Sequence, residues 1–459
     1  MIWNNIEIIN AIKPINVKSL NNDFKIKNIS IDTRNINNDS LFIAIKGKKF
    51  NGHNFIKQAQ EKGANSIIAE NEDHCIVGDL QYFIVKDSIK ALQDLAYYRR
   101  KQLKEKTKII AVTGSTGKTT VKEIISYLLK EYKIHYNFLN YNNHIGLPLT
   151  IAKCPKNIDF LIVEMGTSSI GEIDLLSKIA QPNISIINNI GTAHIGKIGS
   201  VENILLAKSE IFNHAYGTAI LFNDDKFEKI KNIAIDKNIS NVISFGYSEN
   251  SDLQMLSIEE NKKCKIKYKN KNIEFFISQN SKSLFHNFTC ALSAISSFDD
   301  IEKYKHDTKN FLPPESRGSI KKYLFNRKHI SVFDVSYNAN LESFSENLQN
   351  FWNNFSHIKG RKIAFIGSMK ELGNFTEKLH IELANIIVKM NFDIIYLIGE
   401  ETKIMINILK SQYFYPNINL MIDNLTKNDF CDKDTIFVQG SNNVKMNSLI
   451  KWFEQYSQD

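Results

Sequence analysis

The chain has 459 residues, of which 43% are apolar and 23% charged, and its net charge is +9. At about 100–200 residues per domain, this length predicts about three globular domains. The positive charge is spread through lysine-rich stretches and forms no basic stripe interleaved with aromatic residues, so we expect no nucleic-acid partner. No run approaches the roughly 18 apolar residues of a membrane helix, and no apolar leader is visible. We therefore expect no membrane insertion and a cytoplasmic location.

The cysteine pattern excludes two kinds of site. The five cysteines lie far apart and form no C-x-x-C pair: Cys75, Cys154, Cys264, Cys290 and Cys431. This spacing predicts neither a disulfide framework nor a zinc site. It is typical of reduced thiols in a cytoplasm.

Residues 1–103 predict a small α/β domain. Short strand candidates cover residues 29–32, 41–45, 66–69 and 82–85, and helical patterns cover about 55–61 and 89–101. Polar turns separate these segments. The charged stretch 99–108 then indicates a linker or the end of a helix.

A phosphate-binding loop is predicted at the start of the next domain. The apolar run 109–112 predicts a buried strand, two glycines follow, and a helical pattern opens at Lys118. Glycines let backbone N–H groups approach a polyphosphate, and a helix N-terminus adds its positive dipole end. Lys118 would reach the terminal phosphates and the Thr119 hydroxyl would bind Mg²⁺. The expected nucleotide contacts are Gly114, Ser115, Thr116, Gly117, Lys118, Thr119 and Thr120.

Strands and helices alternate over residues 104–310 in the manner of a parallel sheet, which predicts a central mononucleotide-binding domain. Residues 160–163 and 184–187 are apolar enough to be strands buried on both faces. Residues 253–278 alternate around Asn261 and predict a hairpin. A helix over 289–298 would close the domain.

Three polar residues of this domain could carry chemistry: Glu164, His194 and Lys208. Glu164 ends an apolar strand, where open α/β sheets place their ligands, and its carboxylate could bind Mg²⁺. His194 follows the strand that begins at residue 184. Each also has a structural interpretation: Glu164 as a solvated strand end, and His194 as a hydrogen-bonded structural histidine.

Lys208 interrupts an apolar helical stripe. On a helix over 201–212, Lys208 projects from the face that carries Ile204, Leu205 and Ile211. Either its side chain snorkels to water, or burial lowers its pKa and frees the amine for chemistry such as reaction with carbon dioxide.

Residues 311–459 predict a small Rossmann-like, doubly wound domain that begins at a proline-bearing boundary. Four strand candidates cover 329–333, 362–366, 393–398 and 435–438, each followed by a helical pattern. No G-x-G-x-x-G is present. The polar runs Asp334–Asn340 and 367–373 follow strands and are either ligand-binding loops or ordinary turns and helix caps.

Several of these motifs together resemble the Mur ligases, which are ATP-dependent amide-forming enzymes of peptidoglycan synthesis. The run Asn140-Tyr-Asn-Asn-His-Ile-Gly-Leu-Pro148 is similar to the family's N-x-N-N-x-I-G-x-P. The run Asp334-Val-Ser-Tyr-Asn-Ala-Asn340 is similar to the D-x-Y-N-A-N-P of the member that adds a dipeptide. These two runs are more specific than the phosphate loop, which alone does not choose among ATPases.

The resemblance implies a reaction and a cofactor set. ATP would convert the carboxylate of a UDP-N-acetylmuramoyl tripeptide to an acyl phosphate, which the amine of D-alanyl-D-alanine then attacks. Two Mg²⁺ ions are implied, one on Thr119 and one held by Glu164, His194 and a carbamylated Lys208. Lys118, His194 and Lys208 would be the catalytic residues.

The resemblance also implies the remaining ligand contacts. Asn287, Arg317 and Asp334 would contact the nucleotide, with Asp334 on the ribose. The substrate-binding residues would come from all three domains: Thr33, Arg34, Lys46, Gly47, His53, Asn142, Asn143, Tyr337, Asn338 and Asn340.

The sequence departs from the family pattern at several positions. Leu284 and Cys290 stand where glycine and asparagine are expected, which leaves the adenine contacts open. Ser368 stands in place of an aspartate, and Leu341 in place of a proline. We expect a monomeric enzyme. The alternatives are another amide-forming ligase of the Mur or folylpolyglutamate type, or a nucleotide-regulated binding protein without ligase activity.

Overall fold

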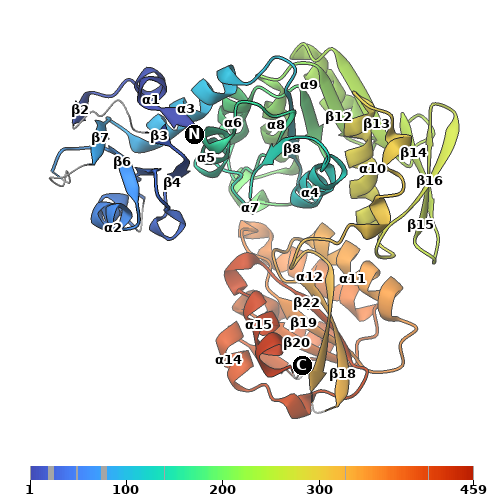
Figure 1. The fold of residues 1–459 in the computed structure, drawn as a ribbon. Coiled ribbons are helices and arrows are strands. Elements are labelled where there is room, and N and C mark those ends of the chain that lie inside the picture. Colours follow the sequence, from blue (N-terminus) through green and yellow to red (C-terminus); the bar gives the residue numbers. More distant parts are fainter. Residues whose placement is uncertain are drawn as a thin grey trace.

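The computed structural model of the protein describes residues 2–18, 25–47, 50–73, 80–138, 140–325, 327–411 and 413–457, and Cys75 lies outside them. Three large sheets follow one another along the chain. The N-terminal unit (blue in Figure 1) lies beside the central unit, and the C-terminal unit (orange and red) lies against another side of the central unit. None of the helices in this described part of the chain is long and apolar enough to cross a membrane.

The N-terminal unit is built on a five-stranded sheet of order β2-β7-β6-β5-β4, in which only the edge strand β2 is antiparallel. Its strands are β2 (Asn16–Lys18), β4 (Asn28–Ser30), β5 (Ser40–Ile43), β6 (Ala64–Ala69) and β7 (Gln81–Ile84). Helices α1 (Asn5–Ile12) and α3 (Ser88–Gln102) pack on one face and α2 (Ile56–Glu61) on the other. A ribbon of β1 (Trp3–Asn4) and β3 (Lys25–Ile26) completes the unit. The four strands and two helices predicted here are confirmed to within about two residues at their ends.

The central unit has a nine-stranded sheet of order β16-β15-β14-β13-β12-β11-β8-β10-β9. Strand β8 (Lys108–Thr113) lies inside it, between β10 (Phe160–Glu164) and β11 (Ile184–Ile187), and the pairing is parallel from β9 to β14. The predicted hairpin is confirmed as β14 and β15, and β16 adds a third antiparallel strand. The other strands are β9 (Ile134–Tyr136), β12 (Thr218–Phe222), β13 (Asn241–Gly246), β14 (Leu253–Ile258), β15 (Lys263–Tyr268) and β16 (Lys271–Phe276).

Both faces of the central sheet are buried, because helices cover each of them. Ile110 and Val112 of β8 contact the core under α4 (Lys118–Leu128) and α10 (Lys282–Ser296). Ile109 and Ala111 point to the opposite core. This alternation explains why β8 is apolar throughout. The second face is covered by α5 (Gly146–Lys153), α6 (Glu172–Ala180), α8 (Val201–Ser209) and α9 (Phe227–Asp236), with the short α7 (Ile195–Ile198) beside them.

Two predicted helices of this unit have different ends in the structure. The helix expected over 289–298 begins seven residues earlier, at Lys282, because the Ser281 hydroxyl accepts the Leu284 N–H at 3.1 Å and caps it. The helix expected over 201–212 ends as α8 at Ser209 and continues as a 3₁₀ turn, Glu210–Phe212.

The C-terminal unit has a six-stranded sheet of order β17-β18-β22-β19-β20-β21, with only β17 antiparallel. The four predicted strands are confirmed as β18 (Lys328–Val335), β19 (Lys362–Gly367), β20 (Ile394–Ile398) and β22 (Thr435–Gln439). The edge strands β17 (Ser319–Phe325) and β21 (Tyr413–Tyr415) were not predicted. Helices α11 (Leu341–Phe355) and α12 (Thr376–Val388) cover one face, and α14 (Ile418–Asp423) and α15 (Asn447–Tyr456) the other. The short α13 (Ile406–Leu409) follows β20.

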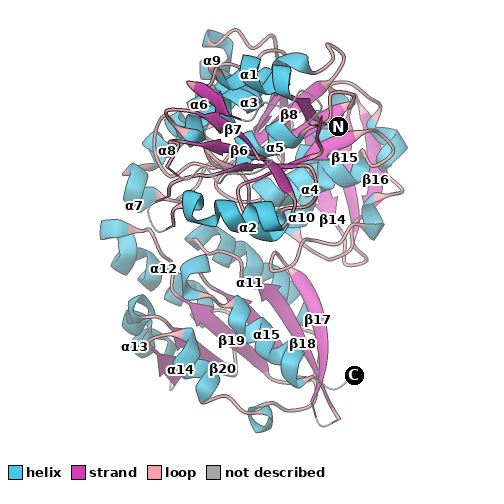
Figure 2. Ribbon diagram, turned by 60° about the vertical axis from the view of Figure 1, so that its left-hand side comes forward, coloured by secondary structure: helices cyan, strands magenta, loops and turns pink. Residues whose placement is uncertain are grey.

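The central and C-terminal units meet along one side of the site. In Figure 2, α12 and α11 of the C-terminal unit lie directly under α7 and α10 of the central unit. The contact between α7 and the segment that leads into the 3₁₀ turn Gly373–Phe375 is a close one, since the Gly196 N–H donates to the Glu371 carbonyl at 3.0 Å. This junction positions the functional residues described next.

Candidate active site

The predicted phosphate loop joins β8 to α4, as its glycine pattern requires. Gly117 has φ +74°, and a Cβ there would lie 2.5 Å from the side-chain amides of Asn188 and Asn287. Only glycine fits this position. The Val121 N–H bonds to the Gly117 carbonyl, so the N–H groups of the preceding helical turn point out of the helix end toward the loop. The loop therefore has the geometry of an anion-binding helix N-terminus.

Two asparagines from the end of β11 hold this loop in place. The Asn189 side-chain oxygen accepts the N–H groups of Ser115 at 3.0 Å and Thr116 at 2.8 Å. The Asn188 amide donates to the Thr116 carbonyl and to Asn287 Oδ1, both at 3.1 Å. Neither asparagine was predicted as a site residue, because an Asn-Asn pair after a strand is also typical of an ordinary turn.

Lys118 and Lys208 converge on one backbone carbonyl. Their Nζ atoms donate to the Gly114 oxygen at 2.8 Å and 3.0 Å respectively. Lys208 is only 2% exposed, so its side chain does not snorkel to water. Burial, followed by the nearby Lys118 charge, brings the pKa of Lys208 well below its ordinary value, and burial also lowers the pKa of Lys118. The site thus holds an amine that is far easier to deprotonate than a surface lysine.

Glu164 and Thr119 meet at the carboxyl end of β10. The Thr119 hydroxyl donates to Glu164 Oε2 at 2.6 Å, and the Asn142 amide donates to Glu164 Oε1 at 2.8 Å. Glu164 is buried. Hydroxyl, carboxylate and amide oxygens within one cluster are the ligands that Mg²⁺ prefers.

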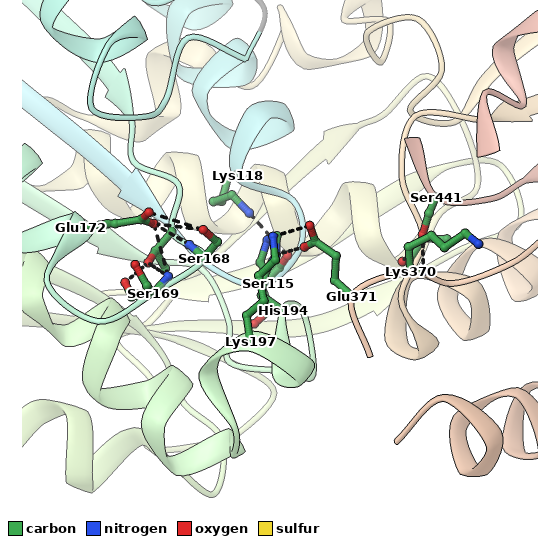
Figure 3. Close-up of polar contacts among 12 residues, drawn as sticks. Ser115, Lys118, Ser168, Ser169, Glu172, His194, Lys197, Lys370, Glu371 and Ser441 are labelled. Carbon is green, nitrogen blue, oxygen red and sulfur yellow. Dashed lines mark hydrogen bonds and ion pairs between the residues drawn. The ribbon is translucent and has the colours of Figure 1, made fainter. Parts of the chain in front are cut away.

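His194 is held by a carboxylate of the C-terminal unit. Its Nδ1 lies 2.6 Å from Glu371 Oε2, and Lys197 Nζ lies 2.6 Å from Glu371 Oε1. Figure 3 shows Glu371 reaching across to these two side chains, with Lys118 and Ser115 close by. Burial lowers the pKa of His194, although the bond to Glu371 acts in the opposite direction.

One cavity of about 860 Å³ joins these groups to the C-terminal unit. The central unit contributes the phosphate loop, Glu164 and His194 to its lining. Across it, the Arg317 guanidinium stacks 3.9 Å over the Tyr337 ring and donates to Asn140 Oδ1 at 3.2 Å. The other predicted residues that line it are Asn142, Asn143, Asn287, Asn338 and Asn340.

Four of the residues predicted for catalysis, nucleotide or metal lie outside the lining of this cavity: Gly114, Thr119, Lys208 and Asp334. Lys208 is behind the loop, bonded to the Gly114 carbonyl. The fully buried Asp334 carboxylate accepts bonds from Ser336 and Ser316 of its own unit. A ribose contact would require this carboxylate to exchange one of these partners.

The residues predicted for a UDP-sugar form a separate group in the N-terminal unit. The Thr33 hydroxyl donates to Gln58 at 2.6 Å, and Arg34 forms a bidentate pair with Asp32. His53 is buried, and its Nε2 accepts the N–H of Glu70 at 3.0 Å. Lys46 and Gly47 belong to the neighbouring turn, where Lys46 pairs with Asn51 in an isolated bridge.

Comparison with known proteins identifies the family. The descriptions "Mur ligase family, catalytic domain" and "Mur ligase middle domain" match residues 25–104 and 112–295. A UDP-N-acetylmuramoyl-tripeptide--D-alanyl-D-alanine ligase of Bacillus subtilis is 32% identical, covering 82% of this chain and 80% of the relative. The chain belongs to the Mur ligase family. It is an ATP-dependent ligase that forms a C–N bond, and the predicted family resemblance is confirmed.

The likeness of this Mur ligase to its relatives extends over the whole chain. The corresponding ligase of Rickettsia prowazekii is 29% identical over 99% of this chain and 100% of the relative. A crystal structure of MurF from Acinetobacter baumannii superposes with a TM-score of 0.83 at 26% identity, covering 99% of each chain. The structure of MurF ligase from Thermotoga maritima in complex with ADP superposes with a TM-score of 0.75 at 25% identity, covering 95% of this chain and 98% of the other. The predicted three-domain α/β fold is therefore confirmed.

The contacts between the domains of this Mur ligase were not predicted. Glu342, at the start of α11, accepts the N–H and the hydroxyl of Thr192, both at 2.8 Å. Glu371 makes the second set of contacts, to His194 and Lys197. Both carboxylates are 150 residues or more from their partners in sequence, and no local pattern marks them.

Proposed function

We propose that this Mur ligase joins the amine of D-alanyl-D-alanine to the free carboxylate of a UDP-N-acetylmuramoyl tripeptide, and that ATP is converted to ADP and phosphate in the reaction. The cavity is the observation that carries this proposal. It places the phosphate loop, Glu164 and His194 of one domain opposite Arg317, Tyr337 and Asn338 of the next. A nucleotide and an acceptor carboxylate can therefore meet between the two domains.

The phosphate end of the cavity supports transfer of a phosphoryl group. A carboxylate is a poor electrophile, and conversion to an acyl phosphate makes its carbon attackable by an amine. Transfer of this kind depends mainly on positioning and on neutralising the phosphate oxygens. The open N–H groups of α4, Lys118 and Arg317 supply positive charge here.

The proposal includes two Mg²⁺ ions, one of which needs a ligand beyond the side chains present. The Thr119 hydroxyl is bonded to the Glu164 carboxylate, and the oxygens of these two groups suit an ion that accompanies the ATP phosphates. Among the residues that the structure describes, no three His, Cys, Asp or Glu side chains are placed to hold a metal. Glu164 and His194 therefore need a further anionic ligand.

A carbamate on Lys208 would supply that ligand. Burial favours the neutral amine of Lys208, which is the form that reacts with carbon dioxide, and the product is an anion. Its charge would also offset that of Lys118, which shares the Gly114 carbonyl with Lys208. The bound metal would act as a Lewis acid on the phosphoryl and acceptor oxygens.

The substrates would be divided between the domains. Thr33, Arg34, Lys46, Gly47 and His53 would hold the UDP-sugar in the N-terminal domain, while Asn142, Asn143, Tyr337, Asn338 and Asn340 would contact the peptides and Asn287 and Asp334 the nucleotide. We place the domain boundaries at 1–103, 104–310 and 311–459. We expect the enzyme to act as a monomer. We place the enzyme in the cytoplasm, where the ATP it consumes is available.

Phosphate release tests the proposed function. We expect release that requires both the UDP-tripeptide and D-alanyl-D-alanine, because each provides one half of the new amide. Release with either substrate alone would favour a nucleotide-regulated binding protein instead. In Lys208→Ala we expect a loss of at least about a hundredfold, partly restored by short-chain carboxylic acids that replace the missing anion. Full activity in this variant would overturn the carbamate.

A further inference from the structure

The side chain of His194 is fixed by a residue of another domain. Glu371 Oε2 lies 2.6 Å from His194 Nδ1, and the two residues are 177 positions apart in the chain. Both have positive φ, +64° for His194 and +63° for Glu371, a region that non-glycine residues rarely occupy. The contact is thus formed by two unusual backbone turns that face each other across the domain junction (Figure 3).

The segment that carries Glu371 is docked on α7 by more than this one bond. The second oxygen of Glu371 binds Lys197, and its carbonyl accepts the Gly196 N–H at 3.0 Å. A Cβ on Gly196 would lie 2.4 Å from the Gly373 nitrogen, so the two backbones touch. Rotation or withdrawal of the C-terminal domain would remove all three contacts together.

The chemistry of the bond determines the state of the imidazole. An ionised carboxylate only accepts hydrogen bonds, so the proton between Glu371 and His194 resides on Nδ1 of the ring. When the ring carries only this proton, its lone pair is on Nε2, and His194 lines the cavity. A histidine that ligates a metal commonly donates its other ring N–H to a carboxylate, which fixes the tautomer and the ring orientation.

We propose that Glu371 is a positioning residue, which makes His194 a metal ligand only while the C-terminal domain is in contact with the central domain. Domain closure then completes the metal site as well as the nucleotide site. The inference rests on the proposed metal-binding role of His194. Glu371 itself does not line the cavity.

The competing interpretation is that Glu371 only clamps the two domains together. The variant Lys197→Met distinguishes the clamp from the positioning role, because it removes the ion pair to Glu371 and leaves the bond between Glu371 and His194. Both side chains of that ion pair are part-exposed, at 49% and 31%, so its loss is expected to change little. Lys197→Met is therefore the matched control for Glu371→Ala.

The first experiment observes the histidine directly, without metal. Nitrogen-15 NMR of the metal-free protein distinguishes a protonated Nδ1 from a protonated Nε2, and His194→Gln assigns the signal. We expect the Nδ1–H form in the wild type and in Lys197→Met, and its loss in Glu371→Ala. An Nε2–H form in the wild type, or an unchanged spectrum in Glu371→Ala, would overturn the inference.

The second experiment measures metal affinity with Mn²⁺ as the probe, by electron paramagnetic resonance in the presence of a non-hydrolysable ATP analogue. We expect Glu371→Ala to weaken the second Mn²⁺ by about ten- to a hundredfold. Lys197→Met should weaken it by about fivefold or less. His194→Ala shows how much Mn²⁺ affinity is lost when the ligand itself is removed. The double variant with Glu371→Ala should lose no further affinity, because Glu371 acts through His194.

The outcomes separate the two claims. An unchanged affinity in His194→Ala would remove the metal role of His194, and the inference with it. A loss in His194→Ala with none in Glu371→Ala would leave the metal site standing and overturn the role of Glu371. Equal losses in Glu371→Ala and Lys197→Met would show that Glu371 is a clamp only.

Discussion

The two sides of the cavity are held together in different ways. The phosphate loop is fixed inside its own domain, where Asn188 and Asn189 bond to the loop backbone and Gly117 fits between Asn188 and Asn287. Gly191 bonds to Ser115 of the loop at 2.8 Å, but the segment 192–196 that follows is held from outside, by Glu342 and Glu371 of the C-terminal domain. The nucleotide side is thus preformed in the central domain. The side that carries His194 depends on the contact between domains.

This difference suggests a sequence of events during the reaction. A nucleotide can bind to the preformed loop whatever the position of the C-terminal domain. The bonds from Glu342 and Glu371 are part-exposed, and such bonds are individually weak, so we expect the domain contact to open and close. Chemistry would then be limited to the closed arrangement, which also excludes water from the activated carboxylate.

Removal of Lys118 should have the largest effect, because this lysine belongs to the preformed phosphate loop. In Lys118→Met we expect kcat to fall by about 10²–10³-fold, since a charge aimed at the transferred phosphoryl group is lost. The melting temperature should not fall, because the variant no longer buries an amine. Phosphate release and a thermal melt check both points. A loss below tenfold would mean that Lys118 does not face the reacting phosphate.

The variant Gly196→Ala disrupts the domain contact on the side of the cavity that carries His194 and leaves the phosphate loop intact. Its Cβ would lie 2.4 Å from the Gly373 nitrogen and 2.5 Å from the Glu371 carbonyl, so the two domains cannot keep their contact. We expect ligation to fall by at least about tenfold, as for loss of a metal-orienting partner. ADP affinity, measured by calorimetry, should stay close to that of the wild type.

Gly171→Ala is the control for a purely structural loss. Gly171 has φ +90° but nothing within 4 Å of the added Cβ, so the substitution strains the backbone without touching the other domain. It should lower the melting temperature with little change in kcat. If Gly196→Ala behaved in the same way, the dependence of the site on domain contact would be refuted.

Asn189→Ala tests how far the loop is preformed. Its side-chain oxygen accepts two loop N–H groups, and loss of such bonds is worth about 1 kcal/mol, or about fivefold in ADP affinity. We expect weaker binding, because the loop must then be ordered by the nucleotide. Asn223→Ala, which loses a bond to Ser251 outside the loop, should bind ADP normally. Tighter binding in Asn189→Ala would show that Asn189 competes with the phosphates.

The smallest effect concerns stability and pH. The folded-state pKa of Lys208 is depressed by burial, so the folded protein binds fewer protons than the unfolded chain between that pKa and about 10.4. The buried amine therefore destabilises the fold most at low pH, and this penalty shrinks as pH rises. In CO₂-free buffer, Lys208→Met should exceed the wild type in free energy of unfolding at pH 7, by a margin that narrows at pH 9. Urea titrations at pH 7 and pH 9 measure this difference in the free energy of unfolding, and a difference that does not change with pH would contradict the depressed pKa.

Local patterns made most of the fold predictable. The loop between β8 and α4 follows from two glycines and a lysine within a few residues, and the apolar runs marked β10, β11 and the inner strands of the last domain. Edge strands such as β17 were not predicted because polar residues, Lys321 and Lys322 among them, interrupt their apolar residues and leave no apolar run. The early start of α10 depended on a cap at Ser281 that a helical pattern alone does not reveal.

The candidate site was predictable only where its residues are close in sequence or at strand ends. The motif pointed to Lys118 and Thr119, and the apolar stripe pointed to Lys208, although its burial behind Gly114 required the three-dimensional fold. Asn188 and Asn189 resembled a turn. Glu342 and Glu371 act across a domain junction, and their partners are set by how two domains dock, which no periodicity in one chain encodes.

The most direct test of the account is analysis of the products by mass spectrometry. Purified protein is supplied with ATP, Mg²⁺, the UDP-tripeptide and D-alanyl-D-alanine. We predict one UDP-pentapeptide, joined through a new amide bond, for each ADP formed, and no ADP above background when the dipeptide is omitted. ADP formation without the pentapeptide, or with no need for the dipeptide, would contradict the ligase assignment.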